Sequence, residues 1–432
     1  MESIWSKTVE LSNFPVLEGD AKTDVLIIGG GMAGVLCAHY LRSAGVDCLL
    51  VEENTVGSGI TVNTTAKITA QHGLIYYKLL KKFGLEKAKL YLQANLEAVE
   101  EYARLCENMD CDFIRQENCV YAADGADQLI QEFVALKQMG YGAVFRKDLP
   151  IPVKTYGGIF FPNQAQFHPL KFLSELFRGL PIYEHTKVLE LAPHRARTSK
   201  GMIYANKIIV ATHFPMLNKH GSFFLKLYQH RSYCIALENV PPFSGMYVDE
   251  SKTGLSFRGY GDLLIIGGGG HRTGKKGGAW QELEEFAHEH YPGSRVKYRW
   301  AAQDCMSLDG VPYVGSYSNR TQGLYTATGF NKWGMTGSMV AARLLTDLIT
   351  GTANPYERLF SPSRSILHPQ LAINGAEAVA NLLTPTRKRC PHLGCALKWN
   401  PQEHSWDCPC HGSRFSENGD LLDGPATDNI KK

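Results

Sequence analysis

The stretch DVLIIGGGMAGVLCAHYLRSAGVDCLLVE, residues 24–52, decides the fold of the first part of the chain. Within it, Val25–Ile28 is a short apolar run typical of a buried parallel strand, and Met32–Ser43 has the spacing of a helix. Three glycines spaced as G-x-G-x-x-G follow the strand. The first permits a tight turn, the second lets backbone approach a pyrophosphate, and the third lets helix pack on strand. The phosphates would then lie at the helix N-terminus, where N–H groups and the helix dipole favour anions. These glycines are Gly29, Gly31 and Gly34.

A second apolar run and an acid complete the pattern. Cys48–Val51 is followed by Glu52, whose carboxylate can accept hydrogen bonds from an adenosine ribose and would repel a 2′-phosphate. A glycine-rich turn without a ligand is the alternative, but it does not explain strand, glycines, helix, strand and acid in this order. The sequence therefore predicts a dinucleotide-binding α/β unit. The GGGG at 267–270 also follows an apolar run but leads into HRTGKKGG, so we interpret it as a strand end and a loop.

Length and charge set the class of protein. The chain has 432 residues, enough for two or three domains at about 100–200 residues each. Its 45 basic and 42 acidic side chains give a net charge of +3, which offers no electrostatic argument for nucleic acid or an anionic membrane surface. The longest apolar stretch, Val25–Ala38, is too short to span a bilayer, and the N-terminus shows no secretory signal. We expect a soluble, cytoplasmic protein.

Five further motifs carry a resemblance to a known family. The order in which they follow Glu52 resembles the D-amino-acid oxidase/glycine oxidase family of FAD enzymes, across about residues 20–352. The resemblance implies FAD rather than NAD, a discontinuous nucleotide-binding domain and an inserted substrate domain on a mixed sheet. It also implies that a helix over Gly334–Ile349 directs its N-terminus at the flavin and stabilises the reduced anion. The motifs are GSGIT (57–61), TTAK (64–67), KIIVAT (207–212), DGVPYVG (309–315) and ATGFNKWGMT (327–336).

The resemblance also assigns residues to roles. Catalysis in this family depends on positioning, because hydride passes from the α-carbon of a deprotonated amine to the flavin. An Arg usually binds the substrate carboxylate, and Arg258 is our candidate, with an ordinary surface Arg as the alternative. Further catalytic candidates are Lys67, Gln303 and Trp333. The flavin motifs are also flanked by His72, Asp304 and Lys332. Packing is the alternative role for each of these six residues. The residues expected to contact FAD are Gly29, Gly31, Met32, Ala33, Gly34, Glu52, Glu53, Gly59, Thr61, Thr65, Ala66, Lys67, Val188, Ala211, Thr212, Gly310, Gly329, Lys332, Trp333, Gly334, Met335 and Thr336.

The C-terminal tail is rich in cysteine. Of the eleven cysteines, seven lie in residues 1–389 and four in the last 43 residues. Cysteine concentrated locally in a cytosolic chain more often builds a metal site than disulfides. Residues 390–413 read CPHLGCALKWNPQEHSWDCPCHGS, with two Cys and two His arranged to suit a Rieske [2Fe–2S] cluster. Structural zinc and a metal-free site are the alternatives, but zinc does not explain the second cysteine pair. The predicted ligands are Cys390, His392, Cys408 and His411.

This tail resembles the Rieske family. The resemblance implies a disulfide between Cys395 and Cys410, a hydrogen bond from Ser413 to a bridging sulfide, and a covering loop at Gly424–Ala426. Phe415 stands where many high-potential members have a Tyr, so we expect a lower potential. Few residues remain for the module, so we expect two ligand loops and a hairpin turning at 418–419 that needs staples or a partner surface.

The predicted domains follow from these segments. Residues 1–352 form the oxidoreductase: about 20–80, 155–215 and 305–352 bind FAD, and about 81–154 and 216–304 form the substrate and cap region. A linker at 353–385 carries a short helix, Gly375–Leu383. Residues 386–432 form a shortened Rieske domain.

The combination resembles bacterial FAD-dependent oxidoreductases that are fused to a Rieske domain. We expect oxidation of a CH–NH bond in a small amine or amino acid, by hydride transfer to flavin. Electrons then pass one at a time to the cluster and to an external one-electron acceptor. A dehydrogenase is favoured over an oxidase, because the cluster would be unnecessary if dioxygen reoxidised the flavin. An electron-transfer protein without its own substrate, or a redox sensor, is the alternative; a homo-oligomer is left open.

Overall fold

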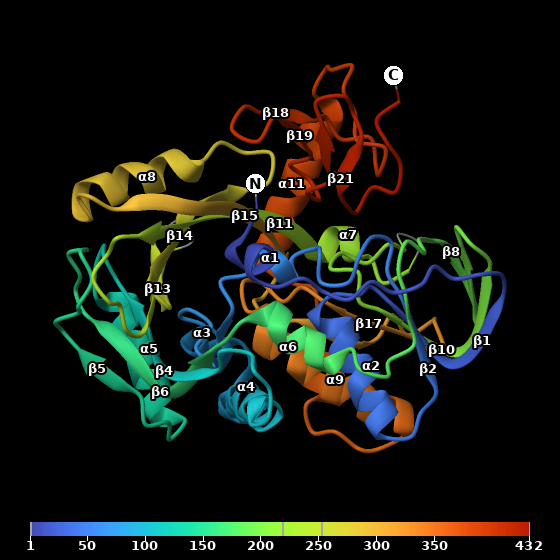
Figure 1. Cartoon of the computed structure of the whole chain (residues 1–432), viewed down its shortest axis with the longest axis horizontal. Coiled ribbons are helices and arrows are strands. Elements are labelled where there is room, and N and C mark those ends of the chain that lie inside the picture. Colours follow the sequence, from blue (N-terminus) through green and yellow to red (C-terminus); the bar gives the residue numbers. More distant parts are fainter. Residues whose placement is uncertain (1, 218–219, 252–253, 432) are drawn as a thin grey trace.

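The computed structural model describes residues 2–217, 220–251 and 254–431. Within these residues the strands form three sheets, of eight, nine and four strands. Figure 1 shows the eight-stranded sheet on the right, the nine-stranded sheet on the left, and the small sheet of the C-terminal module (residues 386–432) above them. The predicted fold class, an α/β nucleotide-binding unit with an inserted α+β unit and a small all-β module, is confirmed.

The eight-stranded sheet has the dinucleotide-binding segment at its centre. The strand β1 (Ala21–Ile28) is parallel to β2 (Cys48–Val51) and β10 (Met202–Val210), and its last four residues are fully buried. The helix α2 (Met32–Ser43) packs on β1, β2 and α9 (Gly334–Thr350). The predicted strands and both helices are therefore confirmed. The sheet also contains β7 (Ile182–Tyr183), β8 (Val188–Ala192), β9 (Arg195–Thr198), β16 (Tyr313–Ser316) and β17 (Leu324–Thr328).

The nine-stranded sheet is mixed, and most of its neighbouring strands are antiparallel. The helix α8 packs on its strands β11 and β14, while α4 and α5 contact β6 (Figure 1). Its strands are β3 (Lys67–Ile68), β4 (Ile114–Tyr121), β5 (Val144–Arg146), β6 (Gly158–Gln166), β11 (Leu227–Glu238), β12 (Met246–Asp249), β13 (Ser256–Tyr260), β14 (Leu263–Arg272) and β15 (Arg295–Ser307). The helices beside it are α3 (Tyr76–Phe83), α4 (Leu85–Cys106), α5 (Asp127–Gln138) and α8 (Ala279–His290).

Two expectations about these strands are wrong. Of residues 155–215, which we expect to bind FAD, the strands β7 to β10 do lie in the eight-stranded sheet, but β6 pairs with β4 and β5 in the nine-stranded sheet. The glycines 267–270 do not form a loop, because β14 continues through them to Arg272. A Cβ on Gly267 would lie 2.7 Å from the Ser256 Oγ, so glycine serves close packing between strands here rather than a turn.

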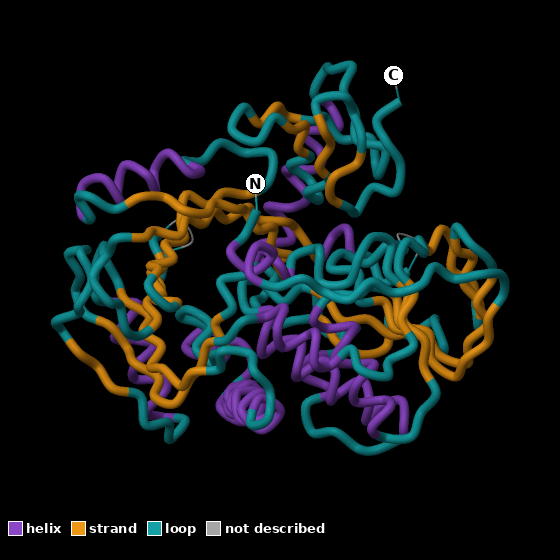
Figure 2. Tube along the Cα trace, viewed as in Figure 1, coloured by secondary structure: helices purple, strands orange, loops and turns teal. Residues whose placement is uncertain are grey.

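The C-terminal module is mostly loop, as Figure 2 shows. Its short strands pair in the order β18, β19, β20, β21, and the predicted hairpin at 418–419 joins the last two. The helix α11 (Pro369–Leu383) starts six residues earlier than predicted, because His368 caps it and Pro369 suits its first turn. The strands are β18 (Lys398–Asn400), β19 (Ser405–Asp407), β20 (Arg414–Ser416) and β21 (Leu421–Asp423).

The remaining helical elements are short, apart from α6, which His168 caps by accepting a hydrogen bond from the Lys171 N–H. No helix in the described part of the chain combines the length and apolar character needed to cross a membrane. These elements are α1 (Ile4–Thr8), η1 (Thr61–Asn63), α6 (Pro169–Leu176), α7 (Phe223–Lys226) and α10 (Glu357–Phe360).

Candidate functional site

A cavity of about 1400 Å³ is lined by both large sheets and by the C-terminal module. This volume exceeds the roughly 300–1,000 Å³ of ordinary ligand pockets, so the cavity has room for a large cofactor and a second molecule. The carboxyl ends of β1, β2 and β10 reach it through Gly29, Glu52 and Ala211. Ligands of open α/β sheets bind at this edge.

The glycine motif shapes one wall of the cavity. Gly29 has a φ of 110°, and a Cβ there would lie 2.6 Å from the Ala211 carbonyl oxygen. A Cβ on Gly34 would lie 1.9 Å from the Gly29 oxygen. Gly31 is the N-cap residue of α2 and provides no side-chain cap, so a helix N-terminus opens on the cavity, as an anionic pyrophosphate requires. The cradle therefore fits a dinucleotide.

Glu52 holds the loop that contains this motif. Its carboxylate accepts hydrogen bonds from the N–H groups of Gly30, at 2.7 Å, and Asn54, at 2.9 Å. Burial raises the pKa of Glu52, although these hydrogen bonds partly oppose the shift. The side chain lines the cavity, where a ribose would meet it.

Most residues that the sequence assigned to FAD line this cavity, but four do not: Gly34, Ala66, Gly329 and Thr336. Gly34 serves the packing of α2 on the β1 turn. The Thr336 hydroxyl donates to the Thr69 carbonyl and contacts His72 Nε2. These residues support the wall instead of forming its surface.

Arg258 does not lie in the cavity, so the predicted carboxylate clamp is wrong at this position. Its side chain is fully buried on β13, and its guanidinium donates to the carbonyls of Thr65, Ala66 and Phe167. The guanidinium also lies over the rings of Trp5 and Tyr260. Arg258 thus holds the TTAK segment (64–67) in place from outside the cavity. In the sequence, Arg258 is recognisable only as an arginine near the end of a predicted strand. That position does not distinguish a substrate clamp from a structural role.

The predicted catalytic residue Gln303 lines the cavity, but its amide is already paired. Its Nε2 donates to the Gly412 carbonyl at 2.9 Å, and its Oε1 accepts from Thr273 at 3.0 Å. We therefore correct its role: Gln303 positions a loop of the C-terminal module.

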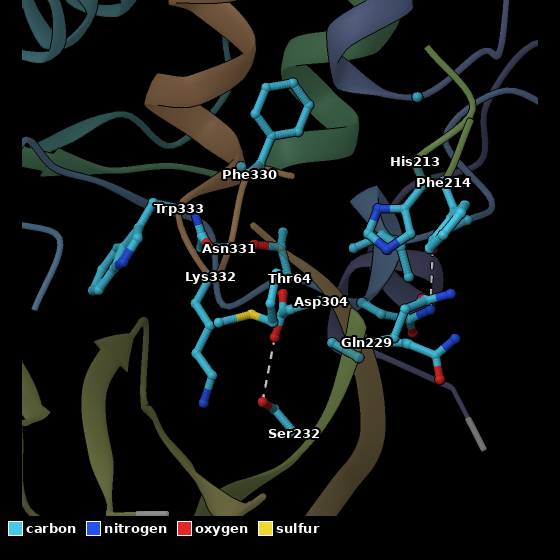
Figure 3. A pocket seen from close by; sticks show the side chains of 18 of the residues that line it. Thr64, His213, Phe214, Gln229, Ser232, Asp304, Phe330, Asn331, Lys332 and Trp333 are labelled. Carbon is cyan, nitrogen blue, oxygen red and sulfur yellow. Dashed lines mark hydrogen bonds between the residues drawn. The ribbon is translucent and has the colours of Figure 1, made fainter. Parts of the chain in front are cut away.

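Three charged residues of the cavity wall, Lys67, Asp304 and Lys332, come from separate parts of the chain, and Figure 3 shows Asp304 and Lys332. Lys67 lies on β3, and removal from water, together with the nearby Arg258 cation, lowers its pKa to about 7. Asp304 accepts a hydrogen bond from Ser232 at 3.3 Å, and burial raises its pKa to about 6. Lys332 faces the same space and opposes that rise. An acid and two lysines can therefore bind or exchange protons with a charged substrate.

Trp333 stacks on His72, with ring centroids 5.1 Å apart and planes 12° from parallel. Burial lowers the pKa of His72 to about 3, so this ring is neutral at pH 7. The pair forms the wall at the N-terminus of α9. Sequence reasoning missed Ser232 and Cys234, which reach the cavity from β11. Their strand shows no motif that could have indicated them.

The four predicted cluster ligands come together in the C-terminal module. The rings of His392 and His411 are 4.9 Å apart, and the buried Nδ1 of His411 has no hydrogen-bond partner among the described residues. The thiols of Cys390 and Cys408 hydrogen-bond, which raises the pKa of Cys390 and lowers that of Cys408. Burial lowers the pKa of His392 to about 3 and of His411 to about 4, leaving the neutral imidazoles that metals bind. This donor set fits a cluster with two thiolate and two imidazole ligands.

The outer cysteines lie beside these ligands. The Sγ atoms of Cys395, Cys408 and Cys410 are within 4.8 Å of one another, but Cys395 and Cys410 are free thiols in this structure. Their disulfide stays a prediction. Ser413 interacts with Cys390 and accepts from the Ala426 N–H at 3.0 Å, so the covering loop Gly424–Ala426 lies over the ligand loops.

The fold and the two sites define a class: a flavin-dependent oxidoreductase with an attached iron–sulfur module. Comparison with known proteins makes this specific. The chain belongs to the FAD dependent oxidoreductase family, which matches residues 24–348, and a Rieske [2Fe-2S] domain matches residues 372–432. The first domain binds FAD and the second binds a [2Fe–2S] cluster. The Rieske match begins inside α11, whose Asn381 carbonyl accepts from the Ala396 N–H of the module.

Individual proteins are similar to this chain over its whole length or over its larger part. YhfW of Bacillus subtilis (strain 168), named as a Rieske 2Fe-2S iron-sulfur protein, is 34% identical over 494 residues, covering 100% of this chain and 97% of its own. Gamma-glutamylputrescine oxidoreductase of Escherichia coli (strain K12) is 22% identical over 382 residues, 80% of this chain and 87% of its own. The structure of glycine oxidase from Geobacillus kaustophilus superimposes with a TM-score of 0.67 at 20% identity, covering 80% of this chain and 100% of that one.

Proposed function

We propose that this protein is a dehydrogenase that oxidises a CH–NH bond of a small amine or amino acid. Bound FAD would take the hydride, and the cluster would pass the electrons singly to an external one-electron acceptor. The observation that carries this proposal is the continuity of the two sites. The covering loop of the cluster, Gly424–Ala426, is itself part of the cavity wall.

The substrate class is supported by the charged groups of the cavity and by the relatives. Glycine oxidase and gamma-glutamylputrescine oxidoreductase are named for substrates that contain an amine. An amine must lose its proton before it can give up hydride. Lys67, with a pKa of about 7, is half neutral at neutral pH and can accept that proton. Asp304 can orient the cationic end of the incoming substrate.

The cluster supports the proposal of a dehydrogenase rather than an oxidase. A one-electron carrier at the cavity wall would be redundant if dioxygen removed both electrons. Localisation in the cytoplasm and a homo-oligomeric state stay predictions.

The first test is EPR spectroscopy of anaerobically purified, dithionite-reduced protein, with iron and flavin measured on the same sample. We expect a Rieske-type signal and about two irons per FAD. Amines and amino acids are then screened anaerobically for bleaching of the flavin absorbance. Zinc in place of iron would contradict the electron-transfer part of the proposal. Iron without bleaching by any amine would favour an electron-transfer protein fed by a partner.

A further inference from the structure

Phe214 lies between the cavity and the cluster ligands. It follows β10 on the segment that begins with Ala211 and Thr212, and its side chain is 4% exposed. Its ring centroid is 6.3 Å from that of His392 and 6.3 Å from that of His411, with planes 79° and 74° apart. The same residue lines the cavity, as Figure 3 shows. Within the described part of the chain, a single aromatic ring thus contacts both histidine ligands and the cavity.

The second ligand loop is held against this ring by side chains of the oxidoreductase. Gln229 Nε2 donates to the His411 and Gly424 carbonyls, both at 3.0 Å. Arg272 donates to the carbonyls of Pro409, at 3.0 Å, and Cys410, at 3.1 Å. Together with the bond from Gln303 to Gly412, these contacts fix the backbone from 409 to 412. The histidine side of the cluster site therefore faces the oxidoreductase.

A buried ion-pair network fixes the module as a whole. Glu403 pairs with Arg231 of β11 and with Arg414 of β20, and the three side chains are 5–7% exposed. Tyr233 also donates to Glu403 at 2.9 Å. These contacts tie the module to β11 of the oxidoreductase in a defined position, with the ligand loops facing Phe214.

We propose that Phe214 is the bridge across which electrons pass from the FAD cavity to the cluster histidines of the same chain. This inference rests on the proposed function. Oxidation of the CH–NH bond to C=N removes a hydride and a proton, which amount to two electrons and two protons. The electrons leave the cavity one at a time across Phe214, and the protons go to solvent. Each electron then reduces one molecule of the external acceptor, so two acceptors are reduced per substrate.

The test compares three variants of the full-length protein carrying both cofactors. Phe214→Leu removes the ring but keeps an apolar side chain, and Phe214→Tyr restores a ring. Phe224→Leu is the matched control, because Phe224 lies 6.4 Å from the His411 ring but does not line the cavity. The flavin is reduced anaerobically by a light pulse with EDTA as electron donor and without substrate. Cluster reduction is then followed by absorbance and by EPR of frozen samples.

We expect the rate of cluster reduction to fall by about tenfold or more in Phe214→Leu, equivalent to at least about 1.4 kcal/mol in the barrier. Phe214→Tyr and Phe224→Leu should remain close to the unmodified protein. The cluster midpoint potential, its EPR signal and the iron content should be unchanged in all three, because Phe214 provides no ligand. If Phe214→Leu fails to retain its cofactors, Phe214→Met is measured in its place.

The possible failures are distinguishable. Transfer at an unchanged rate in Phe214→Leu would overturn the bridge and leave the proposed function standing. A slower rate accompanied by a shifted midpoint potential would also overturn it, since Phe214 would then act on the cluster itself. If the cluster of the unmodified protein stays oxidised while its flavin is reduced, the proposed function fails and the bridge fails with it.

Discussion

The FAD cavity and the cluster site are assembled from the sequence in different ways. The cavity draws its wall from segments as distant as Gly29, which follows β1 of the eight-stranded sheet, and Ser232, which lies on β11 of the nine-stranded sheet. The four cluster ligands all lie between Cys390 and His411, on two adjacent loops. The larger part of the chain has an extensive hydrophobic core, whereas the cluster site has a small core of its own that includes Cys390 and Cys408. A local site is readily predicted from spacing, but its stability depends on the larger unit beneath it.

We expect the largest effect from a substitution that removes a cluster ligand and leaves the cavity intact. In Cys408→Ser a thiolate ligand is lost, and we expect iron to fall close to zero while FAD remains bound, because no cavity residue is changed. Iron and flavin are quantified on the purified variant. The control is Cys119→Ser, a buried cysteine of β4 that takes no part in either site. Joint loss of FAD and iron would show that the two regions do not assemble separately.

The next prediction tests how far the module depends on the oxidoreductase. Burial alone would raise the pKa of Glu403, but Arg231 and Arg414 outweigh it and hold the pKa below its usual value. Glu403→Gln removes the ion-pair partner of the buried Arg231, whereas Arg414 keeps Asp407 and Asp423; loss of one member of a buried pair should cost about 3–5 kcal/mol. We expect the cluster absorbance to disappear at a lower urea concentration than in the unmodified protein. Glu190→Gln, which breaks an exposed pair with Arg197, should leave that concentration unchanged.

The same ion pair gives a pH dependence with a definite sign. A carboxyl group whose pKa is depressed on folding contributes stability above its unfolded pKa and loses it as pH falls through the folded value. Docking of the module should therefore weaken only in acid, below about pH 4, the usual pKa of Glu. Glu403→Gln should abolish this acid transition. Persistence of the transition in the variant would assign it to other carboxylates.

Sequence reasoning succeeded where function depends on local spacing. The turn from β1 to α2 and the set Cys390, His392, Cys408 and His411 are short-range patterns, whereas the order of the FAD motifs was interpreted through a resemblance to a known family. It failed where partners come from different strands. Arg258 sits beside the TTAK loop because β13 passes behind it, and Gln303 reaches Gly412 because the module docks there. Neither pairing leaves a periodic or compositional signal.

A smaller effect tests the role of Lys67 in the cavity. If Lys67 accepts the substrate proton, kcat/KM of the unmodified protein should rise as pH rises through about 7, where Lys67 becomes neutral. Lys67→Met should lower kcat/KM by about a hundredfold, the low end for a general base, and should remove this rise. The profile is measured with the substrate found by the bleaching screen. Lys78→Met, at an exposed lysine that also lines the cavity, should keep the rise.

The smallest effect concerns the electronic environment of the cluster. Phe415 is fully buried on β20, in the core that surrounds the cysteines, and it has no hydroxyl to donate to a ligand sulfur. Phe415→Tyr should supply that hydrogen bond and stabilise the reduced, more negative cluster. A bond of about 1 kcal/mol corresponds to an upward shift of roughly 40 mV in a one-electron midpoint potential, measured by EPR-monitored redox titration.

Trp406→Phe, which removes a donor from the half-buried ring of the neighbouring strand, should leave the potential unchanged. A downward shift in Phe415→Tyr would mean that the new hydroxyl is buried without reaching the sulfur. The low potential expected of this cluster would then depend on its packing against the oxidoreductase rather than on residue 415.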